Sequence, residues 1–202
     1  MKSQQVFLCA CASLAAGAAA EAEPSVAPQL AVPHGQVLRL KALATGVQNY
    51  ACSEGRTGLE WTFKGPQAEL TDEAGRAIGK HYAGPTWEAS DGSKVVGRVV
   101  SSIDSESRDA IAQLLLVSTE NSGSGVFANV KSIQRLETTG GLPPKEPCQR
   151  DQLGRLVQSP YTATYYFYAD APPSGESAAG MLSVLALLIN PSTIRLPKGR
   201  VS

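Results

Sequence analysis

The feature of this chain that most restricts its fold is a succession of short segments in which apolar and polar residues alternate. Residues 59–64 are the clearest case, with large apolar side chains at every second position: Leu59, Trp61 and Phe63. Successive side chains of a strand lie on opposite faces, so this period of two is typical of a half-buried strand. Gly, Pro and Asp separate the segments at close intervals. The pattern predicts an all-β protein, a single-domain antiparallel β-sandwich or barrel-like fold.

The expected strands follow one another closely. Alternation, apolar runs or β-branched content predict them at residues 36–42, 47–52, 59–63, 68–70, 77–82, 86–88, 95–103, 111–117 and 161–168. In the last segment, alternate residues are expected to share one face: Tyr161, Ala163, Tyr165 and Phe167. Residues 126–138 fit either a helix face or a strand, and both interpretations stay open.

Turn composition predicts the connections between these strands. We expect Gly46 to break the first segment and Gly65-Pro66 to form a turn. Residues 71–75 and Gly84-Pro85 also have turn composition. Asp91-Gly92 predicts a tight hairpin, because both residues tolerate the positive φ that such a turn needs.

Residues 1–22 have the composition of a signal peptide. Lys2 is the one charged residue before Glu21, and a short apolar run followed by small residues lies between them. The alternatives are a retained N-terminal anchor and a lipoprotein attached at Cys11. The apolar run is short for a membrane span, which needs about 20 residues. We therefore expect a secreted protein, located in a periplasm or outside the cell.

Composition divides the rest of the chain into three parts. Residues 23–35 are rich in Ala, Pro and Glu and predict a flexible leader. Residues 36–169 form the predicted β domain. Residues 170–202 read as a linker followed by an apolar and basic C-terminal tail. The tail's apolar stretch is about half of the roughly 20 residues that a span needs, so no membrane span is expected in the mature domain.

Cysteine usage predicts a disulfide. Cys9 and Cys11 leave with the signal peptide, and Cys52 and Cys148 remain. An even count in an exported chain favours a bond between the two. The alternative is two separate buried thiols.

The charge balance excludes a strongly electrostatic partner. The chain has 18 basic and 18 acidic residues, so it offers no footprint for nucleic acid. Two histidines, His34 and His81, with scattered carboxylates do not make a zinc set, so no metal site is expected. Neither a Gly-x-Ser-x-Gly elbow nor a phosphate-loop motif occurs in the sequence.

Several long segments resemble the family of the domain of unknown function 3455. The best match is residues 81–97, and residues 44–52, 61–66, 122–127, 133–136, 140–141 and 160–168 complete it. The resemblance runs from about residue 32 to residue 169. It implies an exported, β-rich protein with the paired cysteines, and it implies no activity. The segment after residue 169 departs from the family pattern.

Residues 123–128 fit the Gly-x-Gly-x-x-Ala form of the dinucleotide fingerprint. A true nucleotide site needs a tight turn from a strand into a helix, and then a second strand with an acidic residue. No such unit fits the residues downstream, which contain Gly140-Gly141 and Pro143-Pro144. We therefore interpret the segment as a Gly-rich β loop and expect no cofactor.

Residues 81–94 hold the one concentration of polar and aromatic side chains. The candidate ligand-binding residues are His81, Tyr82, Trp87, Glu88, Asp91 and Lys94. In this hypothesis Trp87 is the apolar wall of a site, and Glu88 with His81 or Asp91 could carry acid–base chemistry. The structural alternative is that Trp87 belongs to the core and that the charged side chains face solvent.

The sequence favours binding over catalysis. We expect an exported, non-enzymatic β domain that binds a small molecule, a glycan or an envelope partner. The alternative is a secreted hydrolase that uses Glu88. Convergence of Glu88, His81 and Trp87 on one pocket would favour a ligand site or an enzyme, and separate environments would favour structural roles.

Overall fold

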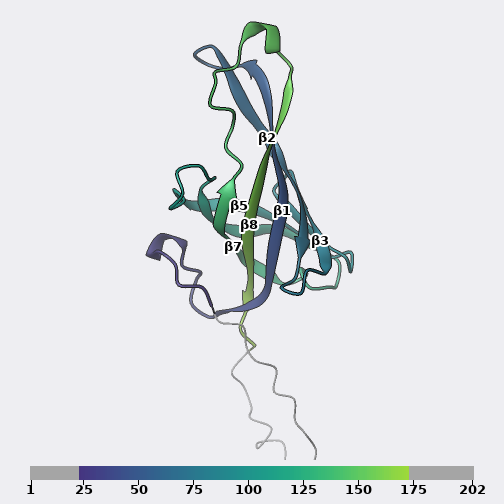
Figure 1. The fold of residues 1–202 in the computed structure, drawn as a ribbon. Helices are drawn as coiled ribbons and strands as arrows, with labels where there is room; N and C mark the ends of the chain where they lie inside the picture. Colours follow the sequence, from purple (N-terminus) through teal and green to yellow (C-terminus); the bar gives the residue numbers. More distant parts are fainter. Residues whose placement is uncertain (1–22, 173–202) are drawn as a thin grey trace, which may run out of the picture.

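The computed structural model describes residues 23–172, in which eight antiparallel strands close into a barrel in sequence order (Figure 1). The strands are β1 (Gln36–Glu54), β2 (Leu59–Thr71), β3 (Ala77–Tyr82), β4 (Thr86–Ala89), β5 (Lys94–Ile103), β6 (Gln113–Ser122), β7 (Val130–Gly140) and β8 (Leu156–Asp170). Two short 3-10 helices accompany them, η1 (Pro28–Leu30) and η2 (Arg150–Gln152). The all-β prediction is confirmed, and of the two expected forms the chain adopts the barrel.

Two predicted turns follow directly from local chemistry. The Asp72 carboxylate accepts hydrogen bonds from the backbone N–H of Ala74 and Arg76, at 3.0 and 2.9 Å, which fixes the turn between β2 and β3. Between β4 and β5 the chain turns at the predicted place, and Gly92 has a φ of +84°, but Asp91 does not take the positive φ expected of it.

Two other predicted breaks are wrong, because the chain continues through both as strand. Gly46 lies inside β1 opposite Ala68, and a Cβ there would overlap the backbone of Gln67 and Ala68. Gly65-Pro66 lies inside β2 opposite Asn49 and Gln48, beside a bulge in the β1–β2 register. A bulge tolerates a proline inside a sheet. Residues 47–52 and 68–70 are therefore the continuations of β1 and β2 and not separate strands.

The ambiguous segment at residues 126–138 resolves as loop and strand. β7 begins at Val130, and the residues before it connect β6 to β7. β-branched content, and not the helical spacing of its apolar residues, was the informative property of this segment.

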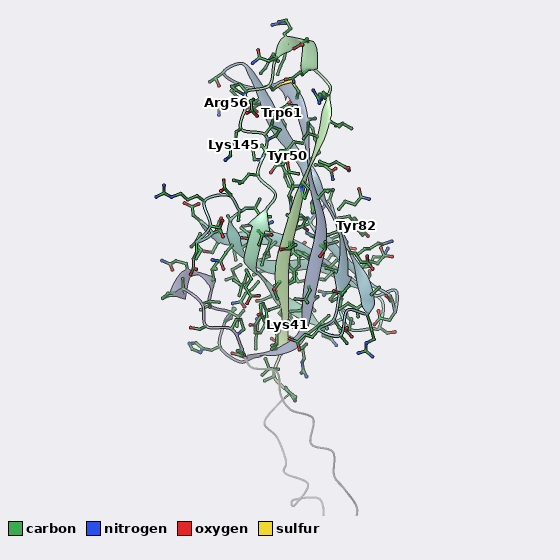
Figure 2. All side chains as sticks on the ribbon, viewed as in Figure 1. Lys41, Tyr50, Arg56, Trp61, Tyr82 and Lys145 are labelled. Atoms are coloured by element: carbon green, nitrogen blue, oxygen red, sulfur yellow. A yellow bond between two sulfur atoms is a disulfide. The ribbon has the colours of Figure 1, made fainter. Side chains whose placement is uncertain are left out.

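The long strands project beyond the barrel as an arm, defined here as residues 50–63 and 145–158. Figure 1 shows β1, β2 and the start of β8 extending well past the other strands. Arg56, Trp61 and Lys145 lie along this arm (Figure 2). The Cys52–Cys148 disulfide joins its two segments, with the Cα atoms 5.6 Å apart, so the predicted bond is confirmed.

β8 is buried on both faces. Its predicted inward residues lie in the main core: Tyr161, Ala163, Tyr165 and Phe167. On the outer face Tyr166 and Tyr168 pack in a second cluster with Leu30. A strand covered on both sides needs a layer outside the barrel, and the N-terminal segment supplies it.

That layer comes from residues expected to be a flexible leader. Leu30 in η1 is only 1% exposed, and its carbonyl accepts a 2.7 Å hydrogen bond from the Gln134 side chain. Neither short helix in residues 23–172 has the length and apolar character to cross a membrane. The predicted signal peptide and most of the predicted tail lie outside the described residues.

Candidate functional site

The predicted ligand-binding residues lie on three adjacent strands and the β4–β5 turn, and those on the strands are divided between two faces of the barrel wall. In the β3–β4 register His81 stands opposite Trp87, and both are buried, at 2% and 1% exposure. Their neighbours Tyr82 and Glu88 therefore point to the outer face, since successive residues of a strand alternate. The structure does not bring Glu88 and His81 together, as an acid–base pair would require.

On the outer face Glu88 is the centre of a polar cluster. The Tyr82 hydroxyl donates a 2.8 Å hydrogen bond to Glu88 Oε2, and Lys94 Nζ lies 3.2 Å from the same oxygen. Lys80, which sequence reasoning missed, lies 3.4 Å from Oε1. The hydrogen bond from Tyr82, followed by that from Lys94, lowers the pKa of the Glu88 carboxyl. The cluster borders a hollow of about 720 Å³ on the outside of the wall.

Asp91 serves the turn and the loop beside it. One carboxylate oxygen accepts hydrogen bonds from Ser93, and the other accepts one from the Val126 N–H at 2.8 Å. This ties the β4–β5 turn to the Gly-rich segment, which connects two antiparallel strands and carries Phe127 into the core. The segment therefore has the geometry of a β loop and lacks the helix that a dinucleotide fingerprint needs.

A pocket of about 320 Å³ opens where β2 leaves the barrel for the arm. Its lining comes from seven strands, β2 to β8, and the β3–β4 turn: Phe63, Lys64, Gly65, Pro66, His81, Ala83, Gly84, Pro85, Trp87, Val99, Leu114, Leu116, Arg135 and Tyr165. Gly65 lies at this edge with a φ of +129°, and a Cβ there would lie 2.6 Å from the Ala83 Cβ, so glycine lets the β3–β4 turn pack this closely. The volume lies at the small end of ligand pockets, which hold roughly 300–1,000 Å³.

Aromatic rings form the inner wall of the pocket. His81 stacks on Trp87 with the ring centroids 4.4 Å apart, and Tyr165 meets both rings edge-on. His81 Nδ1 lies 2.9 Å from the Thr86 carbonyl oxygen. In the neutral ring that contact needs the proton on Nδ1, which leaves Nε2 as an acceptor.

Burial keeps this histidine uncharged. Removal from water lowers the pKa of His81 to about 3, and the Arg135 guanidinium acts in the same direction. The hydrogen bond to Thr86 opposes the shift without cancelling it. His81 therefore contributes shape and a hydrogen-bond acceptor to the pocket at neutral pH, and no charge.

Arg135 and Tyr165 are pocket residues that sequence reasoning did not select. Arg135 Nε and Nη2 both donate to the Ala112 carbonyl, at 3.1 and 2.9 Å. The Tyr165 hydroxyl lies near Arg135 and Tyr161, yet it makes no hydrogen bond of normal geometry. One signal could have found Arg135: in a strand it shares the inward face with Ile133, where a charge is unusual.

The two hollows differ in how far their polar groups are already satisfied. On the outer face Glu88 has Tyr82, Lys80 and Lys94 as partners. In the pocket, Trp87 Nε1 and the Tyr165 hydroxyl are buried without a partner. Buried polar groups are nearly always hydrogen-bonded, so unsatisfied ones mark a place where a ligand or water belongs. The pocket is therefore the better candidate site.

Residues 33–169 match the family described as protein of unknown function (DUF3455). Neither a curated protein nor a solved structure shows significant similarity to the chain.

Proposed function

Since this chain belongs to the DUF3455 family, whose function is unknown, we propose from its own geometry that it binds a small, partly apolar molecule in the barrel pocket. The observation that carries the proposal is the pair of buried, unpartnered polar groups, Trp87 Nε1 and the Tyr165 hydroxyl, on a largely apolar lining. An apolar cavity with a few convergent polar groups is the usual form of a small-molecule site.

Binding fits this pocket better than hydrolysis. Among the described residues that line it there is no carboxylate, and His81 is uncharged at neutral pH. The carboxylate that the hydrolase hypothesis relied on, Glu88, lies on the other face of the wall and is engaged there by Tyr82 and two lysines.

The pocket mouth offers a test with a matched control. Val99 lines the pocket and is 43% exposed, while Val100 is 44% exposed and does not line it. We expect the neutral fluorescent probe N-phenyl-1-naphthylamine to bind the purified chain saturably. Val99→Trp should block the mouth and weaken binding about tenfold or more, whereas Val100→Trp should leave it unchanged. Equal binding by the two variants, or no saturable binding at all, would exclude this pocket.

We also propose that the protein is exported from the cytosol. A disulfide within residues 23–172 is compatible with secretion, since such bonds persist in oxidising compartments. We expect residues 1–24, fused to a reporter, to direct its secretion with cleavage near Ala20 or Ala22. A reporter that stays in the cytosol uncleaved would contradict export.

A further inference from the structure

The charged groups of the pocket all have one sign. Arg135 and Lys64 line it, and no acidic residue of the described chain does. Arg135 belongs to none of the ion pairs formed within residues 23–172. Its guanidinium donates two hydrogen bonds of normal geometry, and both go to one neutral carbonyl, that of Ala112. A guanidinium stays protonated in proteins, and a half-buried one without a counter-charge is costly.

Hydrogen-bond donors dominate the same wall. Indole Nε1 can only donate, and Trp87 has no acceptor for it. The Tyr165 hydroxyl is also free to donate, and both side chains are 1% exposed. Arg135 adds donors that its single carbonyl partner cannot use up, because a guanidinium carries five N–H groups. These donors outnumber the acceptor that neutral His81 offers through Nε2, so a ligand that brings an acceptor, preferably a negatively charged one, would match the pocket.

The remaining lining is apolar. Phe63 and Val99 stand at the mouth, and Leu114 and Leu116 line the pocket from β6. A small inorganic anion would leave these surfaces unfilled, whereas an apolar body attached to the anion would cover them.

We propose that the ligand is a small organic anion, a monocarboxylate with an apolar body, whose carboxylate is held by Arg135 and whose body lies between Trp87 and the apolar mouth. The proposal rests on the proposed function above and adds the ligand class to it. The carboxylate accepts from the guanidinium and from the Tyr165 hydroxyl or Trp87 Nε1, which satisfies the donors that the protein leaves free.

Three probes separate head group from body in the unmodified chain. Octanoate has both, 1-octanol has the body without the charge, and acetate has the head without the body. Calorimetry or displacement of N-phenyl-1-naphthylamine should give octanoate an affinity about tenfold or more above that of 1-octanol, with acetate not binding. Equal affinity for octanoate and 1-octanol would overturn the anion inference and leave the proposed binding function standing. Probe binding without any displacement by octanoate would also overturn it.

Variants locate the charge. Arg135→Gln should weaken octanoate binding about 10- to 100-fold and leave 1-octanol binding unchanged. Lys131→Gln removes one positive charge from the exposed face of the same strand and should change neither. Arg135→Lys keeps the charge and should retain most octanoate binding, which separates loss of charge from loss of folding. An Arg135→Gln protein that is folded and binds octanoate normally would exclude Arg135 as the anion partner.

Discussion

At the scale of single residues, the alternation of the strand decides what each side chain can do. His81 and Tyr82 are adjacent in sequence, as are Trp87 and Glu88, yet each pair is divided between the lumen and the outer face. The segment at residues 81–94, selected for its polar and aromatic residues, therefore contains two separate features. His81 and Trp87 line the pocket, and Glu88 and Lys94 belong to a surface cluster on the other face. Proximity in sequence does not place side chains of a strand in one site.

The buried histidine predicts how stability depends on pH. The pKa of His81 is about 3 when folded, against an ordinary value of 6.5, chiefly because of burial. Below pH 6.5 the unfolded chain binds a proton that the folded chain does not, so acid favours unfolding. The stabilisation is complete above about pH 6.5 and is lost as the pH falls toward 3, with a slope approaching about 1.4 kcal/mol per pH unit.

Urea unfolding at pH values between about 6.5 and 5 measures this slope. This pH range lies above the ordinary pKa values of the carboxyls whose pKa is lowered, such as Glu88 and Asp72, so the titration of His81 is measured apart from theirs. His81→Gln should flatten the slope, since glutamine does not titrate. The exposed His34 is the matched control, and His34→Gln should keep the slope of the unmodified chain. A slope that survives in His81→Gln would show that another group carries it.

At the scale of elements, the sequence predicted the turns that local residues form and missed the features that depend on contacts between strands. The turns expected at residues 71–75 and 91–92 occur where their Asp and Gly residues predicted them, although Asp91 does not take the positive φ expected of it. Gly46 and Gly65 look like strand breakers in sequence, but Gly46 lies against the backbone of its paired strand β2 and Gly65 lies against the β3–β4 turn. Such contacts are set by residues far along the chain, which no local pattern encodes.

The candidate site shows the same limit. Arg135 stood in a segment whose helix or strand character the residues left open, so its inward direction could not be derived. The pocket itself draws on seven strands and one turn, and it exists only once the barrel has closed. The sequence could indicate the pocket residues on β3 and β4, but it could not indicate that Arg135 and Tyr165 would lie beside them.

The leader element yields a stability prediction. Leu30 is buried in the outer cluster with Tyr166 and Tyr168, so Leu30→Ala should lower the free energy of unfolding by about 2–5 kcal/mol. The adjacent Gln29 is exposed, and Gln29→Ala should change the free energy by less than about 0.5 kcal/mol. Urea unfolding of the two variants compares them directly. Equal free energies of unfolding for the two variants would mean that residues 23–35 do not stay packed on the barrel in solution, which would agree with the flexible leader that their composition predicts.

At the scale of the whole molecule, the disulfide encloses most of the fold although it lies on the arm. Cys52 and Cys148 are 96 residues apart, and the enclosed chain contains β2 to β7 entirely. A cross-link stabilises mainly by restricting the unfolded chain, so its effect depends on the loop it closes more than on the contacts around it. The bond should therefore stabilise the barrel, and not merely hold the arm together.

We expect Cys52→Ala/Cys148→Ala to lower the global free energy of unfolding by up to about 4–5 kcal/mol, the chain-entropy value for a loop of roughly this size. The free energy of unfolding should also fall more steeply with urea concentration, because an unfolded chain without the cross-link is less compact and exposes more surface.

Trp87 fluorescence in a Trp61→Phe background reports on the barrel, since Trp61 lies on the arm and Trp87 in the core. Ser53→Ala removes an arm hydrogen bond to Thr62 without opening the loop, and it should barely move the barrel transition. A barrel transition that is unchanged in the double cysteine variant would mean that the bond acts only on the arm. A shift of that transition to lower urea would show that the disulfide stabilises the barrel as well as the arm.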